Sequence, residues 1–491
     1  MKTQYIIFAY LLLTLGIGVY MARTNKTVQD MFIAKSGLPI LLIIPLVFGE
    51  VLGGTGTVGG CAQASSGGLS AAWATWGIGL GLVAYVLFFS KFFRVTGATR
   101  GVMSLAEGYE LLFDRRAKVV MLLIVAIVYG ILFALQPVAA AAILAPMFGI
   151  DHRLMLVIVG VLFIIIATAG GLKGVAWVNV IHSFVMYLGL LIVAWMAVSV
   201  AGGINAVKIA APSHYFSLVS PSVGTVVIWL LAATLSQMNS ALMVSVTLGG
   251  KTLRVANRGM VFAAALLIPF ALLPAIIGVV AHVVIPGVPP HDALYVLSAS
   301  MSPWLGGLAS MAVIAAIFSS GPALLLVVST TLTQDLFKGF IKPNASEKET
   351  VIFARLATVV VGFLAIYLAS KTTSIFSSML GAFQIRAIAG VVLLLGLKWS
   401  RVNADAAFWS ILFGGGVAAV WFFSGSPFGI QPLLPALLIG LVILVTITLM
   451  SREPISEGCA LYQELLEKYN NIGEEGLESL EQEIALTKDK K

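Results

Sequence analysis

The sequence predicts an all-α polytopic membrane protein with about thirteen transmembrane helices. Of its 491 residues, 59% are hydrophobic and only 10% are charged, and the mean hydropathy is +1.03. A soluble domain carries about 25% charged residues, so hydrocarbon must surround most of this chain. The apolar residues also form runs long enough to cross a bilayer, and basic residues concentrate in every second loop between those runs.

Each predicted span is a run of roughly 20 mostly apolar residues, the length that a bilayer core requires. The first run, near residues 4–22, has Arg23 and Lys26 after it and only Lys2 before it. A signal peptide has the opposite charge order, so we expect a retained helix with its N-terminus outside. The other expected spans lie near residues 38–62, 71–93, 118–148, 154–171, 176–201, 224–249, 259–285, 304–333, 349–370, 374–397, 405–423 and 432–450.

The charges in the loops predict the orientation of these spans. Basic residues concentrate in alternate loops, starting with the loop after the first span, whereas the loops near 62–71 and 424–432 carry no charge. Because cytoplasmic loops are rich in lysine and arginine, we expect the basic loops and the C-terminus to face the cytoplasm, in a cell (inner) membrane. We expect a membrane domain over residues 1–451 and a cytoplasmic tail over 452–491, which holds ten of the 21 acidic residues.

Composition argues against several classes of function. The net charge of +8 comes from short loops that set topology, so it does not indicate a nucleic-acid partner. The two cysteines, Cys61 and Cys459, imply no disulfide framework. The chain has no P-loop, HExxH motif, paired CxxC motif or nucleophile elbow. We therefore expect no enzyme, no built-in ATPase and no resident cofactor, and we expect the protein to carry a small solute across a lipid bilayer.

Five glycines among residues 53–60 (GGTGTVGG) lie inside the second predicted span. Each glycine in a helix interior costs about 1 kcal/mol relative to alanine. Irregular backbone within a membrane is tolerated only where it is buried in protein or lines a cavity. We expect the helix to break here and to expose carbonyls and amides to an ion or a solute. Close helix packing through small residues is the alternative.

Two charged residues lie deep within predicted spans, Glu50 just before the glycine run and Arg386 in the eleventh span. An unpaired charge at this depth costs several kcal/mol, so both side chains should face protein or water. Glu50 could bind a coupling proton or cation, and Arg386 could bind a substrate carboxylate. A structural ion pair between them is the alternative.

The ninth predicted span contains paired serines, Ser319 and Ser320, beside Pro322. The proline withdraws an amide donor and frees a carbonyl about one turn earlier. The serine hydroxyls would add oxygens suited to a hard cation such as sodium. Alternatively, each hydroxyl bonds the carbonyl one turn back in its own helix.

Uncharged polar residues mark the other candidate positions within the membrane. The seventh predicted span holds three polar side chains within one turn, and we expect this cluster to bind solute. Polar side chains can also simply join helices, at about 1 kcal/mol each. The cluster is Gln237, Asn239 and Ser240, and the isolated candidates are Gln136, Asn179 and His182.

Four segments resemble motifs of one known family, in order and spacing over roughly residues 5–450. Residues 30–34 (DMFIA) resemble a short acidic-aromatic signature, and 170–179 (GGLKGVAWVN) resemble GGLKAVxWTD. Residues 248–259 resemble an LAAK…RxG loop, and 315–338 resemble AAIMST…ST…TxDIYK. This ordered set is similar to the sodium:solute symporter family.

The resemblance implies a LeuT-type core of two inverted repeats, about 38–201 and 224–397, with a broken second helix and alternating access by rocking of helix bundles. It implies sodium ligation by the backbone carbonyls of Gly49, Leu52 and Ala316 and by the hydroxyls of Ser319 and Ser320. It implies solute binding beside Thr55, Gly56, Gln136, Gln237, Asn239 and Ser240.

The sequence also departs from the family pattern. Asn179 stands where the family motif has an aspartate that supports cation binding in some members, and Glu50 adds an acid beside the expected ion site. The surviving serines predict one sodium site, with proton or cation coupling through Glu50 or Asn179 as a rival. Arg386 favours a small organic acid or amino acid over a sugar as the solute.

These observations predict a secondary active transporter that couples symport of a small organic solute to a cation, with sodium favoured over a proton. Two alternatives stay open. One is a proton-coupled or uncoupled carrier on the same fold, and the other is a membrane solute sensor that signals through a partner. No motif specifies an oligomeric state.

Overall fold

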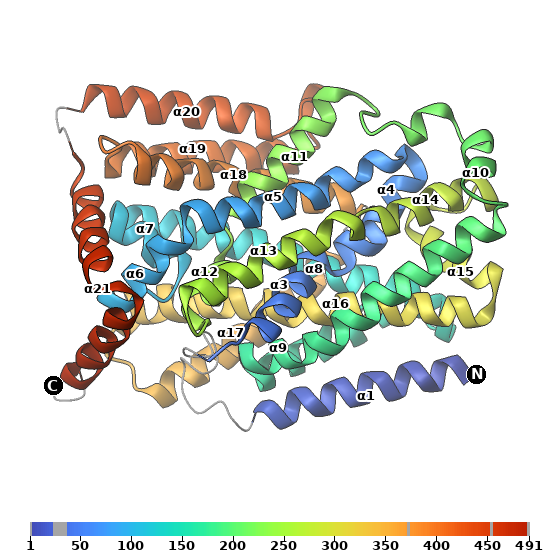
Figure 1. Ribbon diagram of the computed structural model, residues 1–491, viewed down its shortest axis with the longest axis horizontal. Helices are drawn as coiled ribbons and strands as arrows, with labels where there is room; N and C mark the ends of the chain where they lie inside the picture. The colour runs from blue at the N-terminus through green and yellow to red at the C-terminus, as the bar shows by residue number, and fades with distance from the viewer. Residues whose placement is uncertain (1, 23–36, 371–373, 452–454, 489–491) are drawn as a thin grey trace.

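In the computed structural model the chain forms a bundle of helices, described over residues 2–22, 37–370, 374–451 and 455–488. Among those residues the only pairing of the β type is an isolated bridge between Leu38 and Gly250. The motif at residues 30–34 lies outside the described part of the chain. Figure 1 shows most helices running along the longest axis, with the tail helix α21 (Glu457–Lys488) across the end opposite to the start of α1 (Lys2–Ala22).

The predicted all-α polytopic class is confirmed, but the count of thirteen spans is not. Within the described residues, ten helices are long and apolar enough to cross a membrane, or eleven if one bent pair counts as a span. The expected spans near 154–171 and 176–201 fall in one helical element, α9 (His152–Val200), with apolar stretches at His152–Thr168 and Gly174–Val200.

The remaining elements are the other spans and the short segments that connect them. They are α3 (Ile40–Gly54), η1 (Thr55–Gly59), α4 (Gly60–Gly67), η2 (Leu69–Ala71), α5 (Ala72–Phe88), α6 (Ser90–Arg100), α7 (Leu105–Leu112), α8 (Arg115–Phe148), α10 (Ile204–Ala210), η3 (Ser213–Phe216), α11 (Val223–Met238), α12 (Ala241–Gly249), α13 (Leu253–Phe270), α14 (Leu272–Val284), η4 (Pro290–Asp292), α15 (Ala293–Met301), α16 (Pro303–Thr331), η5 (Leu332–Ile341), α17 (Glu347–Ala369), α18 (Ile375–Lys398), α19 (Ala404–Phe423), η6 (Pro427–Gly429) and α20 (Leu433–Met450).

The glycine run interrupts the second predicted span, as expected for so many glycines. Helix α3 ends in Gly53 and Gly54, and Gly53 has φ 44° and ψ −159°, a backbone conformation that favours glycine. The next residues form the π-helical turn η1 before α4 resumes an α-helix. The backbone is therefore irregular in the middle of a buried span.

A second helix interruption lies in the seventh predicted span. No glycine occurs at this interruption, which falls at Asn239 and Ser240. Helices α11 and α12 are bent by 42° relative to each other. Between them Asn239 and Ser240 leave the helical conformation, with ψ values of 46° and 125°. The first helix of each expected repeat is thus broken, as in transporters built from inverted repeats.

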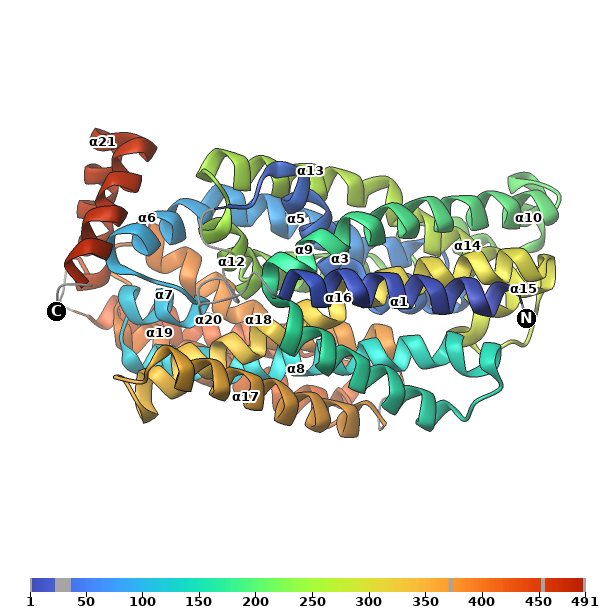
Figure 2. The ribbon, with the colours of Figure 1, turned by 90° about the horizontal axis from the view of Figure 1, so that it is seen from below.

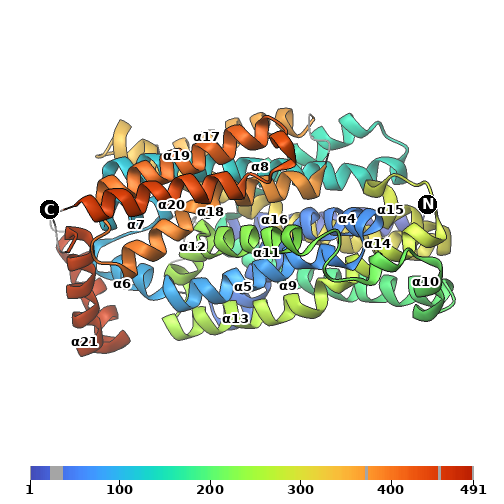
Figure 3. The same ribbon diagram turned by 90° about the horizontal axis from the view of Figure 1, so that it is seen from above.

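Helix α16 lies against the first interruption, and helix α11 leads into the second. Helix α16 packs against α3, α8 and α9 and is buried along most of its length. Helix α11 packs between α5 and α18. Figure 2 shows α1 running along α9 and α16 on one side of the bundle, whereas Figure 3 shows α18, α19 and α20 on another.

The tail forms a helix that packs on the bundle. Leu465 of α21 is buried against Val95 of α6, and the ring of Tyr462 meets that of Phe92 edge-on at 5.1 Å. Cys459 is also buried. The proximal part of the tail is therefore anchored to the short helices α6 and α7.

Candidate functional site

Gln136 of α8 satisfies the backbone at the first break. Its Oε1 accepts a hydrogen bond from the amide of Gly54 at 2.8 Å and another from the Ser320 hydroxyl at 3.1 Å. A Cβ atom on Gly53 would lie 2.5 Å from Ser320 Oγ, so only glycine permits this approach. One side chain on α8 thereby joins the break in α3 to α16.

Hydrogen bonds join four of the five predicted sodium-binding residues where α3 faces α16, namely Gly49, Ala316, Ser319 and Ser320. The Ser319 hydroxyl lies 2.9 Å from the Gly49 carbonyl oxygen and 2.6 Å from that of Ala316. The Ser320 hydroxyl lies 3.2 Å from the same Ala316 oxygen. The Leu52 carbonyl accepts from the Thr55 hydroxyl at 3.1 Å. Carbonyl and hydroxyl oxygens on unwound helices are the ligands that transporters use for sodium.

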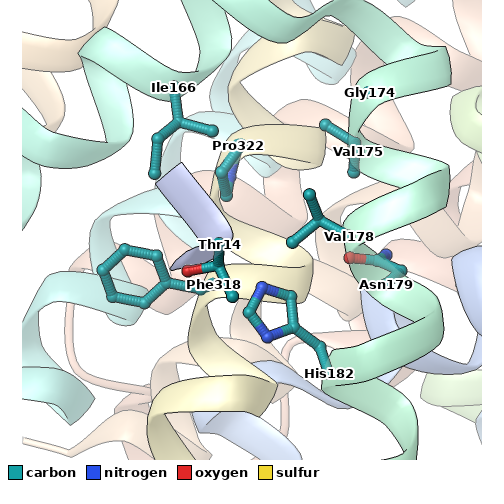
Figure 4. A pocket seen from close by; sticks show the side chains of 9 residues that line it. All are labelled: Thr14, Ile166, Gly174, Val175, Val178, Asn179, His182, Phe318 and Pro322. Carbon is teal, nitrogen blue, oxygen red and sulfur yellow. The ribbon is translucent and has the colours of Figure 1, made fainter. Parts of the chain in front are cut away.

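Asn179 of α9 bonds a member of this cluster, Ser319. Its Nδ2 donates to the Ser319 carbonyl at 3.2 Å, and its Oδ1 is buried without a hydrogen-bond partner. Figure 4 shows Asn179 with His182 and Pro322 around a small cavity beside α16. The ring of His182 also bonds the Tyr10 hydroxyl of α1. The Asn179 side chain therefore contacts the candidate cation site through the backbone carbonyl of Ser319.

Two tyrosines stabilise the second break, and sequence reasoning missed both. The Tyr129 hydroxyl accepts from the amide of Ala241 at 2.9 Å and bonds the Ser240 hydroxyl at 2.9 Å. The Tyr109 hydroxyl lies 2.6 Å from the Ala389 carbonyl and 3.1 Å from Asn239 Oδ1. The spacing of Tyr129 and Gln136, two helical turns apart on one face of α8, is the signal that could have found the first of them.

Arg386 lies beside this second break. Its Nε donates to the Ser236 hydroxyl at 2.9 Å, and its guanidinium lies over the Tyr129 ring, 4.9 Å from the centroid. Its Nη1 is buried without a partner. Among the described residues no ion pair joins it to Glu50, although the two charges are close enough to interact electrostatically.

The predicted solute-binding residues fall into two groups. Thr55, Gly56 and Gln136 belong to the first break, and Gln136 is committed to protein hydrogen bonds. Asn239 and Ser240 form the second break. Gln237 belongs to neither group, and its side-chain amide nitrogen is buried without a hydrogen-bond partner. Helix α8 contacts both breaks. Glu50 follows Gly49 in α3 and interacts electrostatically with Arg386.

This architecture defines a class, the multi-pass transporters with a LeuT-type core. Residues 32–414 match the sodium:solute symporter family, and the chain belongs to this family. It is therefore a sodium-coupled symporter of an organic solute, and not an enzyme.

Individual relatives agree with this assignment. The osmoregulated proline transporter OpuE of Bacillus subtilis is 22% identical over 475 residues, covering 92% of this chain and 96% of the relative. The sodium/glucose cotransporter of Vibrio parahaemolyticus is 26% identical over 454 residues, covering 81% of each. A Na+-coupled sialic acid symporter, solved in a substrate-bound outward-open state, superimposes with a TM-score of 0.78 at 22% identity, covering 93% of this chain and 99% of that one.

Proposed function

We propose that the protein takes up a small organic solute that bears a carboxylate, an organic acid or an amino acid, together with sodium across the cell membrane. The observation that carries the cation part is the Ser319 hydroxyl, which lies within 2.9 Å of carbonyl oxygens on both α3 and α16. A cation bound there holds the two helices together, so it binds one state of the alternating-access cycle better than the other.

The sodium ligands in this proposal are the carbonyls of Gly49, Leu52 and Ala316 and the hydroxyls of Ser319 and Ser320. In the structure the two hydroxyls bond the Gly49 and Ala316 carbonyls and Gln136. The hydroxyl oxygens of Ser319 and Ser320 therefore already lie within hydrogen-bond distance of proposed carbonyl ligands.

The solute part rests on the second break. Arg386 offers a buried donor atom that no protein group uses, and Asn239 Nδ2 is another. Guanidinium groups bind carboxylates strongly and with defined geometry. The proline transported by one relative is a carboxylate of this kind.

Thermal stability of the purified protein tests the sodium site. A ligand at about 100 times its dissociation constant stabilises the folded state by roughly 2.7 kcal/mol. We expect sodium chloride to raise the melting temperature relative to potassium or choline chloride at equal ionic strength, and we expect Ser319→Ala to abolish the rise.

Ser310→Ala is the matched control, because Ser310 is a buried serine of α16 that bonds only its own helix, through the Gly306 carbonyl at 2.7 Å. It should retain the sodium effect. A sodium-specific rise that survives Ser319→Ala would place the cation elsewhere.

A proton-coupled carrier is the second candidate, because Glu50 is a buried acid with an unpartnered oxygen. Uptake into proteoliposomes distinguishes sodium coupling from proton coupling. A sodium gradient at equal pH should drive uptake, whereas a pH gradient without sodium should not. Uptake driven by the pH gradient and lost in Glu50→Gln would favour the proton.

We also propose an N-terminus outside and a C-terminus in the cytoplasm. The alternation of basic loops supports this orientation, and the start of α1 and the tail helix α21 lie at opposite ends of the bundle (Figure 1).

A further inference from the structure

Glu50 of α3 and Arg386 of α18 are opposite charges that do not touch. Their exposed fractions are 7% and 1%. Glu50 Oε2 and Arg386 Nη1 are both buried without a hydrogen-bond partner. Burying such atoms without a protein partner is costly, because the lost hydration is not replaced by a protein hydrogen bond. A molecule that places an anion at Arg386 and a cation at Glu50 would satisfy both.

Two protein contacts hold the guanidinium of Arg386 in place. Its Nε bonds the Ser236 hydroxyl at 2.9 Å, and its guanidinium is stacked over Tyr129, which is itself fixed by Ser240 and the amide of Ala241. The donor at Nη1 is therefore preorganised, and the two charges are held apart by protein contacts. Preorganisation of this kind lowers the cost of ordering the donor when a ligand binds.

The Glu50 end makes a further chemical distinction. A carboxylate oxygen accepts hydrogen bonds, so its best cationic partner is an ammonium that still carries an N–H. A quaternary ammonium supplies charge without a donor. A simple carboxylic acid supplies neither and would leave Glu50 unpaired.

We propose that Glu50 and Arg386 together select small zwitterions with an N–H ammonium group, the chemistry of α-amino and imino acids, over betaines and simple carboxylates. This inference rests on the proposed function and narrows its solute. Arg386 binds the carboxylate, and Glu50 binds the ammonium rather than the coupling ion.

The test begins with binding to the full-length protein in saturating sodium, measured by thermal shift with each of the twenty protein amino acids. The best binder is then compared with three analogues that lack the carboxylate, lack the amine, or carry a fully methylated nitrogen. For proline these are pyrrolidine, cyclopentanecarboxylate and N,N-dimethylproline. Each analogue should bind at least about tenfold more weakly, because a charged hydrogen bond contributes about 1.5–3 kcal/mol.

Variants test whether Glu50 binds the ammonium group and Arg386 binds the carboxylate. Glu50→Gln should reduce the preference for the amino acid over its amine-free analogue to nearly one, while the sodium shift remains. Arg386→Gln should weaken both of these ligands together, and Arg386→Lys should recover part of the binding. Glu464→Gln, an acid on the exposed face of α21, should change none of these values.

The outcomes separate this inference from the proposed function. A sodium shift with no amino-acid binding, or a preference unchanged in Glu50→Gln, overturns the zwitterion site and leaves the symporter intact. Loss of the sodium shift in both Glu50→Gln and Glu50→Asp makes Glu50 part of the cation site and also overturns it. Absence of any sodium shift in the unaltered protein contradicts the proposed sodium site itself.

Discussion

Tyr109 and Tyr129 are buried phenols whose hydroxyl groups stabilise a helix interruption. Where α11 ends, the backbone loses the hydrogen bonds of a continuous helix, and inside a membrane no water can replace them. Tyr129 supplies an acceptor to the amide of Ala241, and Tyr109 supplies a donor to the Ala389 carbonyl of α18. Both side chains therefore favour the bent form of this span over a straight helix.

We expect Tyr129→Phe to lower the melting temperature and to weaken solute binding. The substitution leaves the Ala241 amide without its acceptor, and an unsatisfied buried polar group costs about 1–3 kcal/mol. Thermal shift with and without solute measures both effects. Tyr5→Phe is the control, because Tyr5 is 69% exposed on α1. Equal behaviour of the two variants would contradict a role for the Tyr129 hydroxyl.

Gly53→Ala should destabilise the protein and abolish the sodium effect. The new methyl group would lie 2.5 Å from Ser320 Oγ and 2.6 Å from Gln136 Oε1, at a φ that alanine rarely adopts. Gly130→Ala in α8 is the opposite case, because nothing lies within 4 Å of the added methyl. That control should be neutral or stabilising by up to about 1 kcal/mol. Melting temperatures in sodium and in potassium measure both variants.

At the scale of elements, α7 connects the end of α16 to the second break. Ser104 caps α7 by accepting from the Glu107 amide, and its hydroxyl donates to Asp335 of η5 at 2.7 Å. Lys118 of α8 bonds Glu110 at 2.7 Å and lies 3.8 Å from Asp335. Through Tyr109 the same short helix contacts α18 and the break between α11 and α12.

Glu107 makes this region sensitive to pH. Burial raises the pKa of its carboxyl, against the hydrogen bond from the Met103 amide that lowers it. A carboxyl whose folded pKa is raised favours the folded state at low pH, and stability falls as pH rises above its ordinary value of 4.5. Glu107→Gln should therefore flatten the fall in melting temperature with rising pH. Glu110→Gln should instead lower stability by removing the Lys118 ion pair, so a gain in that variant would contradict this account.

The docked tail helix should detach without disturbing the transport site. Leu465→Ala removes the buried contact with Val95, and truncating a buried leucine costs about 2–5 kcal/mol. We expect faster hydrogen exchange and proteolysis confined to α21, with an unchanged sodium shift. Glu464→Ala on the exposed face is the control. A changed sodium shift in Leu465→Ala would instead couple the tail to the site.

At the scale of the whole molecule, topology is open to direct labelling. Both native cysteines are buried, so a cysteine introduced in a loop reports its own side of the membrane. An impermeant thiol reagent should label Gly203→Cys from outside the cell and Asn344→Cys only after the cytoplasmic side is opened. Reversed labelling would invert the proposed orientation.

The sequence by itself determined the features that depend on local chemistry. Apolar runs are long because each must cross hydrocarbon, and the glycine run at 53–60 breaks α3 because glycine weakens a helix wherever it occurs. The family motifs likewise indicated Ser319 and Ser320. These features require no knowledge of which helix lies beside which.

Only the tertiary structure decided how distant residues complete the two breaks. Gln136 bonds Gly54, Tyr109 bonds Ala389, and Arg386 bonds Ser236 across 82, 280 and 150 positions of the chain. The break at Asn239 carries no glycine that could have indicated it. The electrostatic interaction of Glu50 with Arg386 depends on where α18 places the arginine. Such contacts arise from helix packing, in which the partner of a buried polar group is set by geometry in space and not by its sequence neighbours.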